Sequence, residues 1–371
     1  MKYKVTKDEL LTALLKIQNA SPSKAAIPLL SNVLIEAVDN ELILTCTDLT
    51  MSVRCFVPAV VKESGGTTLP IRRLIHLLKE LTNPEVDISV KDNVSTIKSG
   101  SSRFKVNGMA KDEFPSFPDT DTVQELSFNQ KELKKALQSA SFAVSRDEPD
   151  PWFALTGVLL DVQGETVYFV GTDGKRLAKI AQPSGCTAKV KQKVILPIKS
   201  VEEIIRLLGD DDSATLLISS DRVALDTHST RFVSKVLGGE YPDYEQILPE
   251  KSKYEIKVHR EEISSLLRQI ALFTNENNQS VKFTFEKNTL TLAAVSADIG
   301  EGTVSMPVNY SHEKFNIAFN PWYLLDIIRH VTQETISIRL NDTLNPGVID
   351  DQGTSIYLLM PMRLNEEVTA S

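Results

Sequence analysis

The sequence lacks the features that would place it in a membrane, in an oxidising compartment or around a metal ion. No stretch of its 371 residues approaches the roughly 20 apolar residues that a membrane helix needs. Its three cysteines include no CxxC pair, which argues against disulfides or structural zinc and favours a reducing cytoplasm. None of the five histidines lies at metal-ligand spacing from a cysteine or another histidine. The charged N-terminal segment does not resemble a secretion signal.

Sequence motifs for catalysis are also missing. The chain has no GxGxxG and no GxSxG. The nearest approach to a Walker A loop, residues 171–176, has Phe169 where the first glycine is needed and Arg176 in place of Ser or Thr. Asp48 and Asp173 each follow a threonine, and hydrogen bonds to local backbone N–H groups explain both without two active sites. We therefore expect no catalytic residue, no cofactor and no metal.

The composition is that of a folded protein with more than one domain. Hydrophobic residues make up 42% and charged residues 24%, and a chain of this length exceeds one ordinary core, so we expect two or three domains. The net charge of −8 argues against nucleic-acid binding when taken alone. The charge is unevenly placed, because residues 1–122 are neutral whereas residues 123–250 and 251–371 each carry four more acids than bases.

A pair of β-rich runs joined by a short polar turn occurs three times. The turns are Asp39-Asn40, Gln163-Gly164 and 286–288, and positions 39, 163 and 287 are spaced by 124 residues each time. Such runs predict β-hairpins. Three periods of this length account for nearly the whole chain, so the sequence predicts three similar domains in a row. The predicted boundaries are 1–122, 123–250 and 251–371.

A helical pattern precedes each hairpin and another follows it. The first helix of each repeat follows a candidate N-cap residue, and these residues are Thr6, Asn129 and His259. Thr6 begins a capping-box-like sequence, whereas His259 is a poorer N-cap. The second helices start near prolines, at Pro70, Pro197 and Pro321. Strands then close each repeat, and this order predicts an α+β fold. We expect the last strand, 357–364, to be an edge strand of its own domain, where its methionines and proline also suit an adaptable pocket for partner peptides.

Two of these helices carry basic side chains on one face. They are Arg72, Arg73, His76 and Lys79 in the first repeat, and Lys131, Lys134 and Lys135 in the second. A basic face is most often only a solvated face. Its recurrence in successive repeats favours a shared anionic partner, because an acidic protein can still present a local basic surface to phosphates.

Three segments resemble the β subunit of bacterial DNA polymerase III, the sliding clamp family. They are GTDGKRL at 171–177, YPDY at 241–244 and MPMRL at 360–364, and the likeness runs the whole length. It implies an α+β chain of three similar DNA-clamp domains, with helices lining an inner surface and antiparallel sheets forming an outer wall. Two chains would form a six-domain ring as a head-to-tail homodimer. Double-stranded DNA would pass through the ring without sequence specificity.

The same resemblance implies a non-catalytic, cytoplasmic processivity factor. Its partners would be the DNA polymerase III catalytic subunit, the clamp-loader complex and other proteins with a clamp-binding motif, with no cofactor and no membrane. The partner peptide would bind between domains two and three, at Leu155, Thr172, Gly174, Arg176, Leu177, Pro242, Ile247, Asn320, Tyr323, Leu344, Met360, Pro361, Met362, Arg363 and Leu364.

The resemblance also implies DNA-binding and dimer-contact positions. The DNA-facing residues would be Lys24, Arg72, Arg73 and Lys199. The dimer contact would involve Arg103, Lys105, Ile270, Leu272 and Phe273, with Asp298 or Glu301 as acids for the two cations. Gln246 departs from the arginine that many members carry beside the pocket, and the seven residues after Leu364 are either a frayed tail or a partial cover of the pocket.

Two other functions remain open on the residues alone. An acidic hydrolase or transferase with Asp173 and Arg176 in its site would need more convergent polar groups than the repeats indicate. A three-domain scaffold that never touches DNA would leave several basic residues without a role, namely Arg72, Arg73, His76, Lys79 and Lys199.

Overall fold

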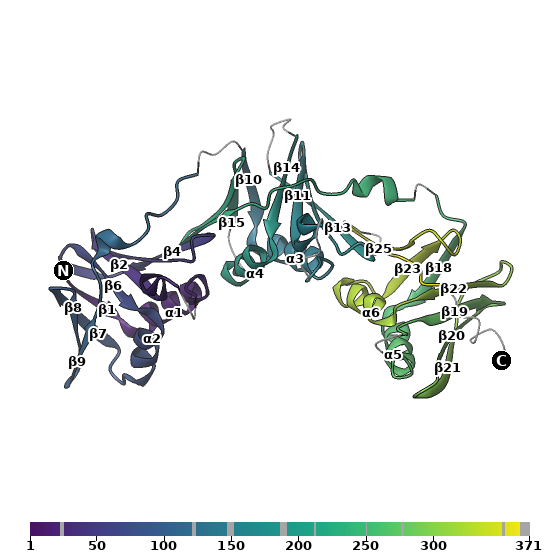
Figure 1. The fold of residues 1–371 in the computed structure, drawn as a ribbon, viewed down its shortest axis with the longest axis horizontal. Coiled ribbons are helices and arrows are strands. Elements are labelled where there is room, and N and C mark those ends of the chain that lie inside the picture. The colour runs from purple at the N-terminus through teal and green to yellow at the C-terminus, as the bar shows by residue number, and fades with distance from the viewer. Residues whose placement is uncertain are drawn as a thin grey trace. The chain divides into compact units, whose positions relative to one another are not determined.

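The computed structural model describes residues 1–22, 26–120, 124–146, 152–185, 191–210, 213–249, 251–275, 278–350 and 353–363 (Figure 1). Their contacts group into two compact units. Unit 1 contains Met1–Lys134, Ser184–Ala188 and Leu196–Leu237, and unit 2 contains Lys135–Pro183, Lys189–Ile195 and Gly238–Ser371. The division falls inside the middle repeat, so the three domain boundaries drawn from the sequence stay a prediction.

Unit 1 contains two antiparallel sheets. The five-stranded sheet has the order β5 (Val60–Glu63), β1 (Lys2–Thr6), β7 (Glu85–Lys91), β8 (Val94–Ser99), β9 (Ser102–Asn107). The eight-stranded sheet has the order β10 (Gln124–Asn129), β15 (Ser213–Ile218), β16 (Arg222–Thr227), β17 (Thr230–Lys235), β4 (Met51–Pro58), β3 (Glu41–Thr47), β2 (Asn32–Val38), β6 (Gly65–Pro70). Its helical segments are α1 (Lys7–Ile17), η1 (Gln18–Ala20), η2 (Pro28–Ser31), α2 (Ile71–Glu80), η3 (Lys111–Glu113) and α4 (Ile198–Leu207).

Unit 2 repeats this plan. Its eight-stranded sheet has the order β14 (Lys191–Pro197), β11 (Gly157–Gln163), β12 (Thr166–Thr172), β13 (Arg176–Pro183), β25 (Ser355–Leu359), β24 (Gly347–Asp350), β23 (Thr335–Leu340), β18 (Tyr254–His259). Its four-stranded sheet has the order β21 (Gly300–Pro307), β20 (Thr289–Ser296), β19 (Val281–Glu286), β22 (Phe315–Phe319). The helical segments are η4 (Phe153–Thr156), η5 (Tyr244–Ile247), α5 (Arg260–Ala271) and α6 (Pro321–His330), while α3 (Gln130–Ser141) crosses the division.

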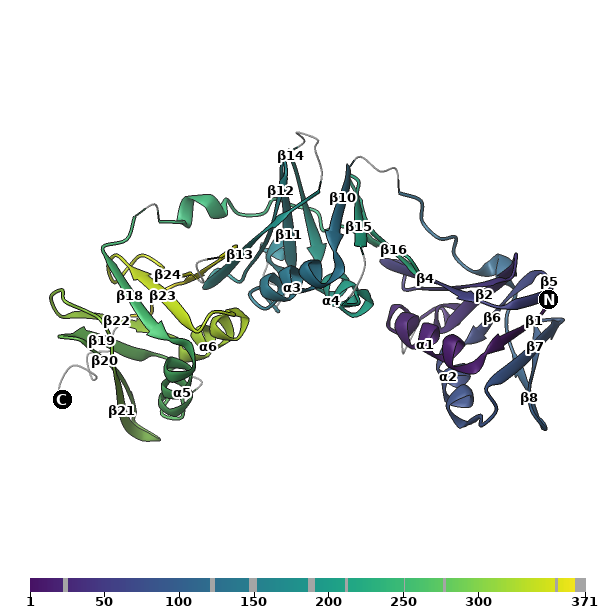
Figure 2. The same cartoon turned by 180° about the vertical axis from the view of Figure 1, so that it is seen from behind.

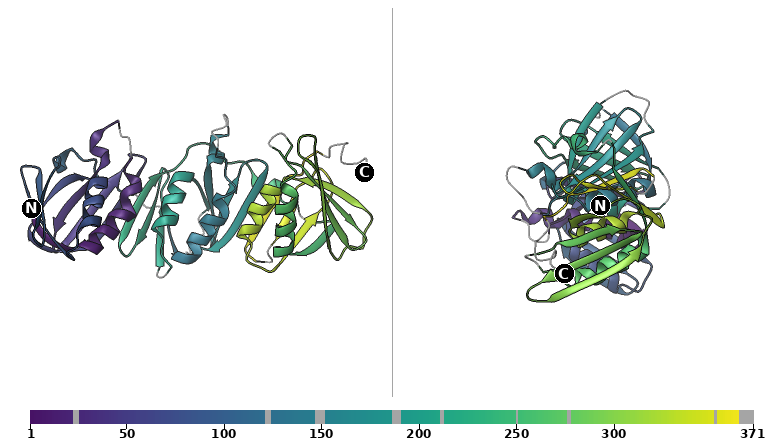
Figure 3. Two further views of the ribbon diagram at one scale, coloured as in Figure 1. Left: turned by 90° about the horizontal axis from the view of Figure 1, so that it is seen from below. Right: turned by 90° about the vertical axis from the view of Figure 1, so that its right-hand side faces the viewer.

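The helices bury one apolar stripe each against the sheets. In unit 1, α1 packs on β3 and β4, and α2 packs on β6. In unit 2, α5 and α6 lie side by side, green and yellow-green in the left view of Figure 3. Of the helices in the described ranges, none combines the length and the hydropathy needed to cross a membrane.

The three hairpins drawn from the sequence are confirmed, but two turns differ: the third is Lys287-Asn288 and not 286–288, because Glu286 pairs with Thr289. The first and third turn on Asp39-Asn40 and Lys287-Asn288, and all four residues have positive φ, as a two-residue hairpin turn requires. The middle hairpin turns on Gly164-Glu165 instead of Gln163-Gly164, because Gln163 still pairs with Thr166. The period of 124 residues is therefore an average of slightly unequal repeats.

The predicted N-caps are confirmed at Asn129 and wrong at Thr6. Asn129 Oδ1 accepts two backbone N–H groups of α3 at 3.0 and 3.3 Å. Thr6 makes no side-chain cap on α1, and the N–H of Lys7 donates to Pro84 O instead. The residue just before β7, which pairs with β1, therefore satisfies the first N–H group of α1.

The last strand lies inside a sheet, so the prediction of an edge strand is wrong. β25 pairs with β13 on one side and β24 on the other, and thereby joins the second and third repeats. In unit 1, β17 and β4 join the second and first repeats in the same way. The register is also the same, because Thr230 faces Cys55 and Ser355 faces Ile180, each residue 125 positions further along. Apolar residues on both faces of β25 are thus those of an interior strand.

Two glycines of unit 2 should differ sharply in their tolerance of a methyl group. A Cβ on Gly171 would collide with the backbone carbonyl of Ala140, whereas a Cβ on Gly164 would meet no atom within 4 Å. We expect Gly171→Ala to lower the free energy of unfolding by about 3 kcal/mol, because α3 must move away from β12. Gly164→Ala only places alanine at positive φ and should cost about 1 kcal/mol. Urea denaturation would measure both losses, and equal losses would contradict this packing.

Candidate functional site

The two Thr-Asp pairs form the same hydrogen-bonded turn, one in each unit. Asp173 Oδ1 accepts the backbone N–H groups two and three positions later, both at 2.9 Å. Asp48 Oδ1 accepts those of Thr50 and Met51 at 2.9 and 2.8 Å. Burial alone would raise the pKa of Asp48, but the bonds from Thr50 and Met51 outweigh it and lower the pKa. The structural role predicted for both aspartates is confirmed.

Arg176 is fixed by several partners within unit 2. Its guanidinium donates to Asp326 Oδ2 at 2.8 Å, to Phe142 O at 3.1 Å and, through Nε, to Asp173 Oδ2 at 3.2 Å. It also lies 4.5 Å from the centre of the Tyr323 ring, and its side chain is only 11% exposed. Arg176 therefore ties the start of β13 to α6 and to the chain after α3. A hydrolase built on Asp173 and Arg176 is left without a free acid–base pair.

Sequence reasoning missed Asp326 and Phe142, which hold Arg176. Asp326 is 150 residues away from Arg176 along the chain, and no motif links the two. The only signal was that Asp326 is the single acid of α6, which has no meaning until the fold is known. Phe142 also stacks on His330, with ring centres 4.5 Å apart and planes 8° from parallel.

The predicted partner-peptide residues differ in how far their side chains are exposed. Those with buried side chains are Leu155, Thr172, Leu177 and Asn320. Those with partly exposed side chains are Arg176, Pro242, Tyr323, Pro361 and Met362, and the exposed ones are Gly174, Ile247, Leu344, Met360 and Arg363. Leu364 and the tail after it lie outside the described residues. The assignment of these residues to one partner site stays a prediction.

Hydrogen bonds explain how the buried members shape the surface. Thr172 Oγ1 donates to Arg176 O at 2.6 Å and so closes the turn before β13. Asn320 Oδ1 accepts the N–H groups of Trp322 and Tyr323 at 2.9 and 3.4 Å, which caps α6. The chain after β25 then runs past both elements, because Met360 N donates to Lys175 O and Met362 N donates to Ala318 O. The two methionines are thereby held next to β13 and the strand before α6.

The predicted DNA-facing residues lie on exposed helix faces of unit 1. Arg72 and Arg73 are exposed on α2, opposite the buried Ile71 and Leu74. Lys199 on α4 is 72% exposed, and its Nζ lies 3.4 Å from Asp48 Oδ2. Lys24 lies outside the described residues.

The predicted dimer residues lie on β9 and at the C-terminal end of α5. Arg103 and Lys105 are exposed on β9, the outermost strand of the five-stranded sheet. Leu272 is 69% exposed and Phe273 is partly exposed after α5. Ile270 is fully buried in its own chain, so it has no surface to offer and any apolar contact falls to Leu272 and Phe273.

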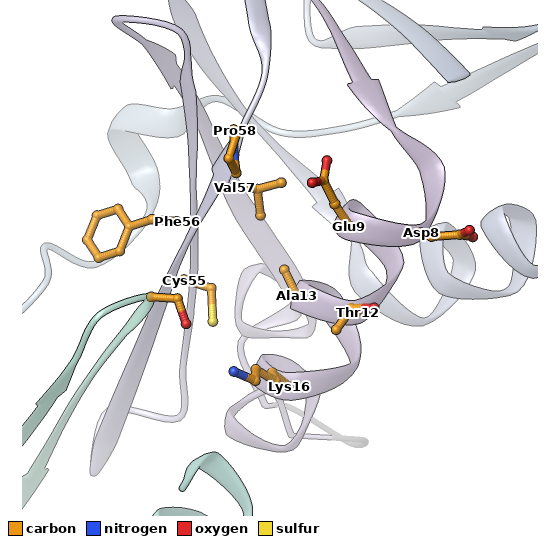
Figure 4. Close-up of a pocket in the computed structure, with 10 residues that line it drawn as sticks. Asp8, Glu9, Thr12, Ala13, Lys16, Cys55, Phe56, Val57 and Pro58 are labelled. Atoms are coloured by element: carbon orange, nitrogen blue, oxygen red, sulfur yellow. The ribbon is translucent and has the colours of Figure 1, made fainter. Parts of the chain in front are cut away.

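A cavity of about 360 Å³ opens between α1 and β4 in unit 1 (Figure 4). Its lining residues are Asp8, Glu9, Thr12, Ala13, Lys16, Cys55, Phe56, Val57, Pro58 and Ser229. Burial raises the pKa of the Cys55 thiol more than Thr230 and Lys16 lower it, so the thiol stays protonated and is a poor nucleophile. Within the described part of the chain, no group of His, Cys, Asp and Glu could hold a metal ion. The cavity thus provides no activated group for catalysis.

Comparison with known proteins identifies the class. Residues 1–118, 127–243 and 245–363 match the N-terminal, central and C-terminal domains of the DNA polymerase III beta subunit. The chain is 43% identical to the beta sliding clamp of Chlamydia muridarum over 368 residues, which cover 99% of this chain and 100% of that protein. The crystal structure of the DNA polymerase III subunit beta from Pseudomonas aeruginosa matches with a TM-score of 0.94 and 28% identity, over 98% of this chain and 100% of that one. A sliding clamp from the same organism bound to griselimycin matches with a TM-score of 0.93, 28% identity and the same coverage.

The fold and these matches define an α+β DNA clamp of three similar domains with antiparallel sheets, as the sequence predicted. The chain belongs to the DNA polymerase III beta subunit family. Its function is that of a DNA sliding clamp, a non-catalytic processivity factor of that polymerase.

We expect the stability of unit 2 to decrease as the pH falls below about 6.5. Burial lowers the pKa of His330, Arg329 and Arg176 lower it further, and Asp326 opposes them. The unfolded chain therefore takes up this proton before the folded chain does. The contribution of His330 to stability is therefore present in full above the pKa that His330 has in the unfolded chain. It is lost as the pH falls through the pKa that His330 has in the folded chain.

The variant His330→Phe, which keeps a ring against Phe142, should remove this part of the pH dependence. Denaturation midpoints of both proteins at about pH 7.5 and about pH 5.5 would measure it. A variant that loses as much stability as the wild type on acidification would show that His330 is not the group responsible.

Proposed function

We propose that two copies of the chain close head to tail into a ring that encircles double-stranded DNA and holds partner proteins on unit 2. The observation that carries this proposal is a pair of edge strands, β9 and β21, each of which is hydrogen-bonded to a neighbour on one side only within the described residues. An open sheet edge is a template for pairing with another chain.

The internal junctions indicate how these edges would be joined. β4 of the first repeat pairs with β17 of the second, and β13 of the second pairs with β25 of the third. By order within the repeat, β21 is the counterpart of β4 and β13, and β9 is the counterpart of β17 and β25. Two chains placed head to tail pair β9 with β21 twice and leave neither edge open, which closes the assembly.

The register of the internal junctions also predicts which residues face each other between chains. Thr230 faces Cys55 in unit 1, and the same count from the hairpin turns places Ser102 opposite Val304. Lys105 then faces Glu301, and Phe104 faces Gly302. Lys105 and Glu301 are oppositely charged, and both side chains are exposed. The Phe273 ring packs against Gly302, so Phe104 would complete an apolar contact with Phe273 and Leu272.

The basic helix faces suit a loose hold on DNA. Arg72, Arg73, His76 and Lys79 are exposed on α2, as are Lys131 and Lys135 on α3. Such side chains attract backbone phosphates without reading sequence. Lys199 is paired with Asp48, so a phosphate must compete with that carboxylate. Weak contacts of this kind let a closed ring slide.

The partner groove of this proposal consists of Pro242, Ile247, Tyr323, Met360 and Met362. The griselimycin complex of a Pseudomonas aeruginosa clamp supports testing griselimycin as a ligand of this groove. The proposed partners are the DNA polymerase III catalytic subunit, the clamp-loader complex and other proteins with a clamp-binding motif, in the cytoplasm where bacterial DNA is replicated.

The double variant Arg72→Glu/Arg73→Glu should weaken retention on DNA. Loss of two phosphate contacts should make the dependence of log affinity on log salt shallower by about 2. Retention would be measured after the clamp loader has placed the protein on nicked circular DNA. The charge-matched control is Lys62→Glu/Lys91→Glu, on the five-stranded sheet. Cutting the circle should release the wild-type protein. A protein that stays bound after the cut would rule out encirclement.

Single reversals at the chain contact should weaken the dimer, and the combined reversal should restore it. Lys105→Glu and Glu301→Lys each place like charges opposite one another and should raise the dimer dissociation constant about tenfold. The double variant restores an opposite pair in swapped order. Sedimentation equilibrium at low salt would measure the dimer dissociation constants of the wild type, the two single variants and the double variant. Additive losses in the double variant would show that the two residues do not face each other.

A further inference from the structure

The connector 241–249 after β17 runs along one face of the eight-stranded sheet of unit 2. Figures 1 and 2 show its short helix η5 on the side of the sheet away from α6. The connector carries two residues of the proposed partner groove, Pro242 and Ile247. Ile247 is 47% exposed, so its own side chain does little to anchor it. The position of these two residues depends on what holds η5 to the sheet.

A buried carboxylate lies beneath η5. Asp161, on β11, is only 2% exposed, and a charge so buried must be matched by donors. Tyr244 Oη, on η5 itself, donates to Asp161 Oδ2 at 2.8 Å. Gln163 Nε2 donates to the same oxygen at 3.0 Å, and Lys193 Nζ lies 3.5 Å away from it. Tyr244 thus joins the connector to a charged network inside the sheet.

A second strand contacts the same helix through a cation. Lys179 Nζ, on β13, lies 5.0 Å from the centre of the Tyr244 ring and 4.3 Å from that of the Tyr168 ring. It also lies 3.9 Å from Glu245 Oε1. We call Asp161, Lys179 and Tyr244 the connector clasp.

Unit 1 contains a simpler form of this clasp. Arg54 is 125 residues before Lys179 and Phe117 is 127 residues before Tyr244, and the Arg54 guanidinium lies 4.3 Å over the Phe117 ring. Phenylalanine has no hydroxyl, so the connector 114–120 lacks a side-chain bond from this ring to a carboxylate. The additional hydroxyl–carboxylate bond occurs on the connector that carries the groove residues.

We propose that the connector clasp positions Pro242 and Ile247 for partner binding. The inference rests on the groove proposed above. Asp161, Lys179 and Tyr244 are positioning residues, since they act through the connector and need not touch the partner. A connector that is already fixed to the sheet loses less conformational freedom when a ligand binds, and the clasp thereby strengthens binding.

Griselimycin binding, measured by calorimetry on the full chain, tests the proposal. Tyr244→Phe removes only the hydroxyl and should raise the dissociation constant about fivefold, the usual effect of one lost hydrogen bond. Lys179→Met should weaken binding to a similar extent. Both effects should be smaller when Ile247→Ala is already present, because the clasp then positions Pro242 alone.

Arg54→Met makes the matching change in unit 1 and should leave griselimycin affinity unchanged. Circular dichroism at the temperature of the titration would verify that each variant is folded. A wild-type chain that does not bind griselimycin would refute the groove, and the inference with it. A wild-type chain that binds while Tyr244→Phe binds equally well would refute the clasp alone. So would a loss that persists in full beside Ile247→Ala, or an equal loss in Arg54→Met.

Discussion

Backbone hydrogen bonding between strands of successive repeats is the interaction on which the rest of the structure depends. β4 and β13 would be sheet edges if each repeat folded alone, and β17 and β25 cover them. Because a paired strand no longer attracts other chains, the same bonds that unite the repeats also protect two of the three edges. The contacts consequently group around the junctions, and the middle repeat is divided between two units.

The junction in unit 2 also brings together residues of the proposed partner groove. Once β25 has paired with β13, the chain beyond it must pass the turn at Lys175 and the strand before α6, where Met360 and Met362 are held by backbone bonds. Arg176, at the start of β13, is brought within reach of Asp326 on α6. Residues from distant parts of the sequence are therefore assembled by one strand pair. In unit 1, Met51 occupies the place of Arg176, so the equivalent junction lacks this arginine.

The features that could be predicted from the sequence are those encoded locally. The hairpin turn at Asp39-Asn40, the existence of the third hairpin and the amphipathic pattern of α2 each depend on neighbouring residues, and all are confirmed. The interior position of β25 and the partners of Arg176 depend on contacts between repeats, which no local pattern records. Thr6 shows the same limit on a small scale, since β7 and its preceding loop displaced the expected cap.

Acidic net charge and DNA binding are compatible when retention is topological. A protein that holds DNA by contacts alone needs many phosphate bonds and becomes slow to move. A closed ring needs only a weak attraction for the phosphates of the duplex, and the few cations of α2 that we propose as DNA contacts would suffice. The pairing of Lys199 with Asp48 then lowers the attraction further. If Lys199 faces DNA as proposed, the carboxylate beside it weakens each phosphate contact, and weak contacts that exchange rapidly are what sliding requires.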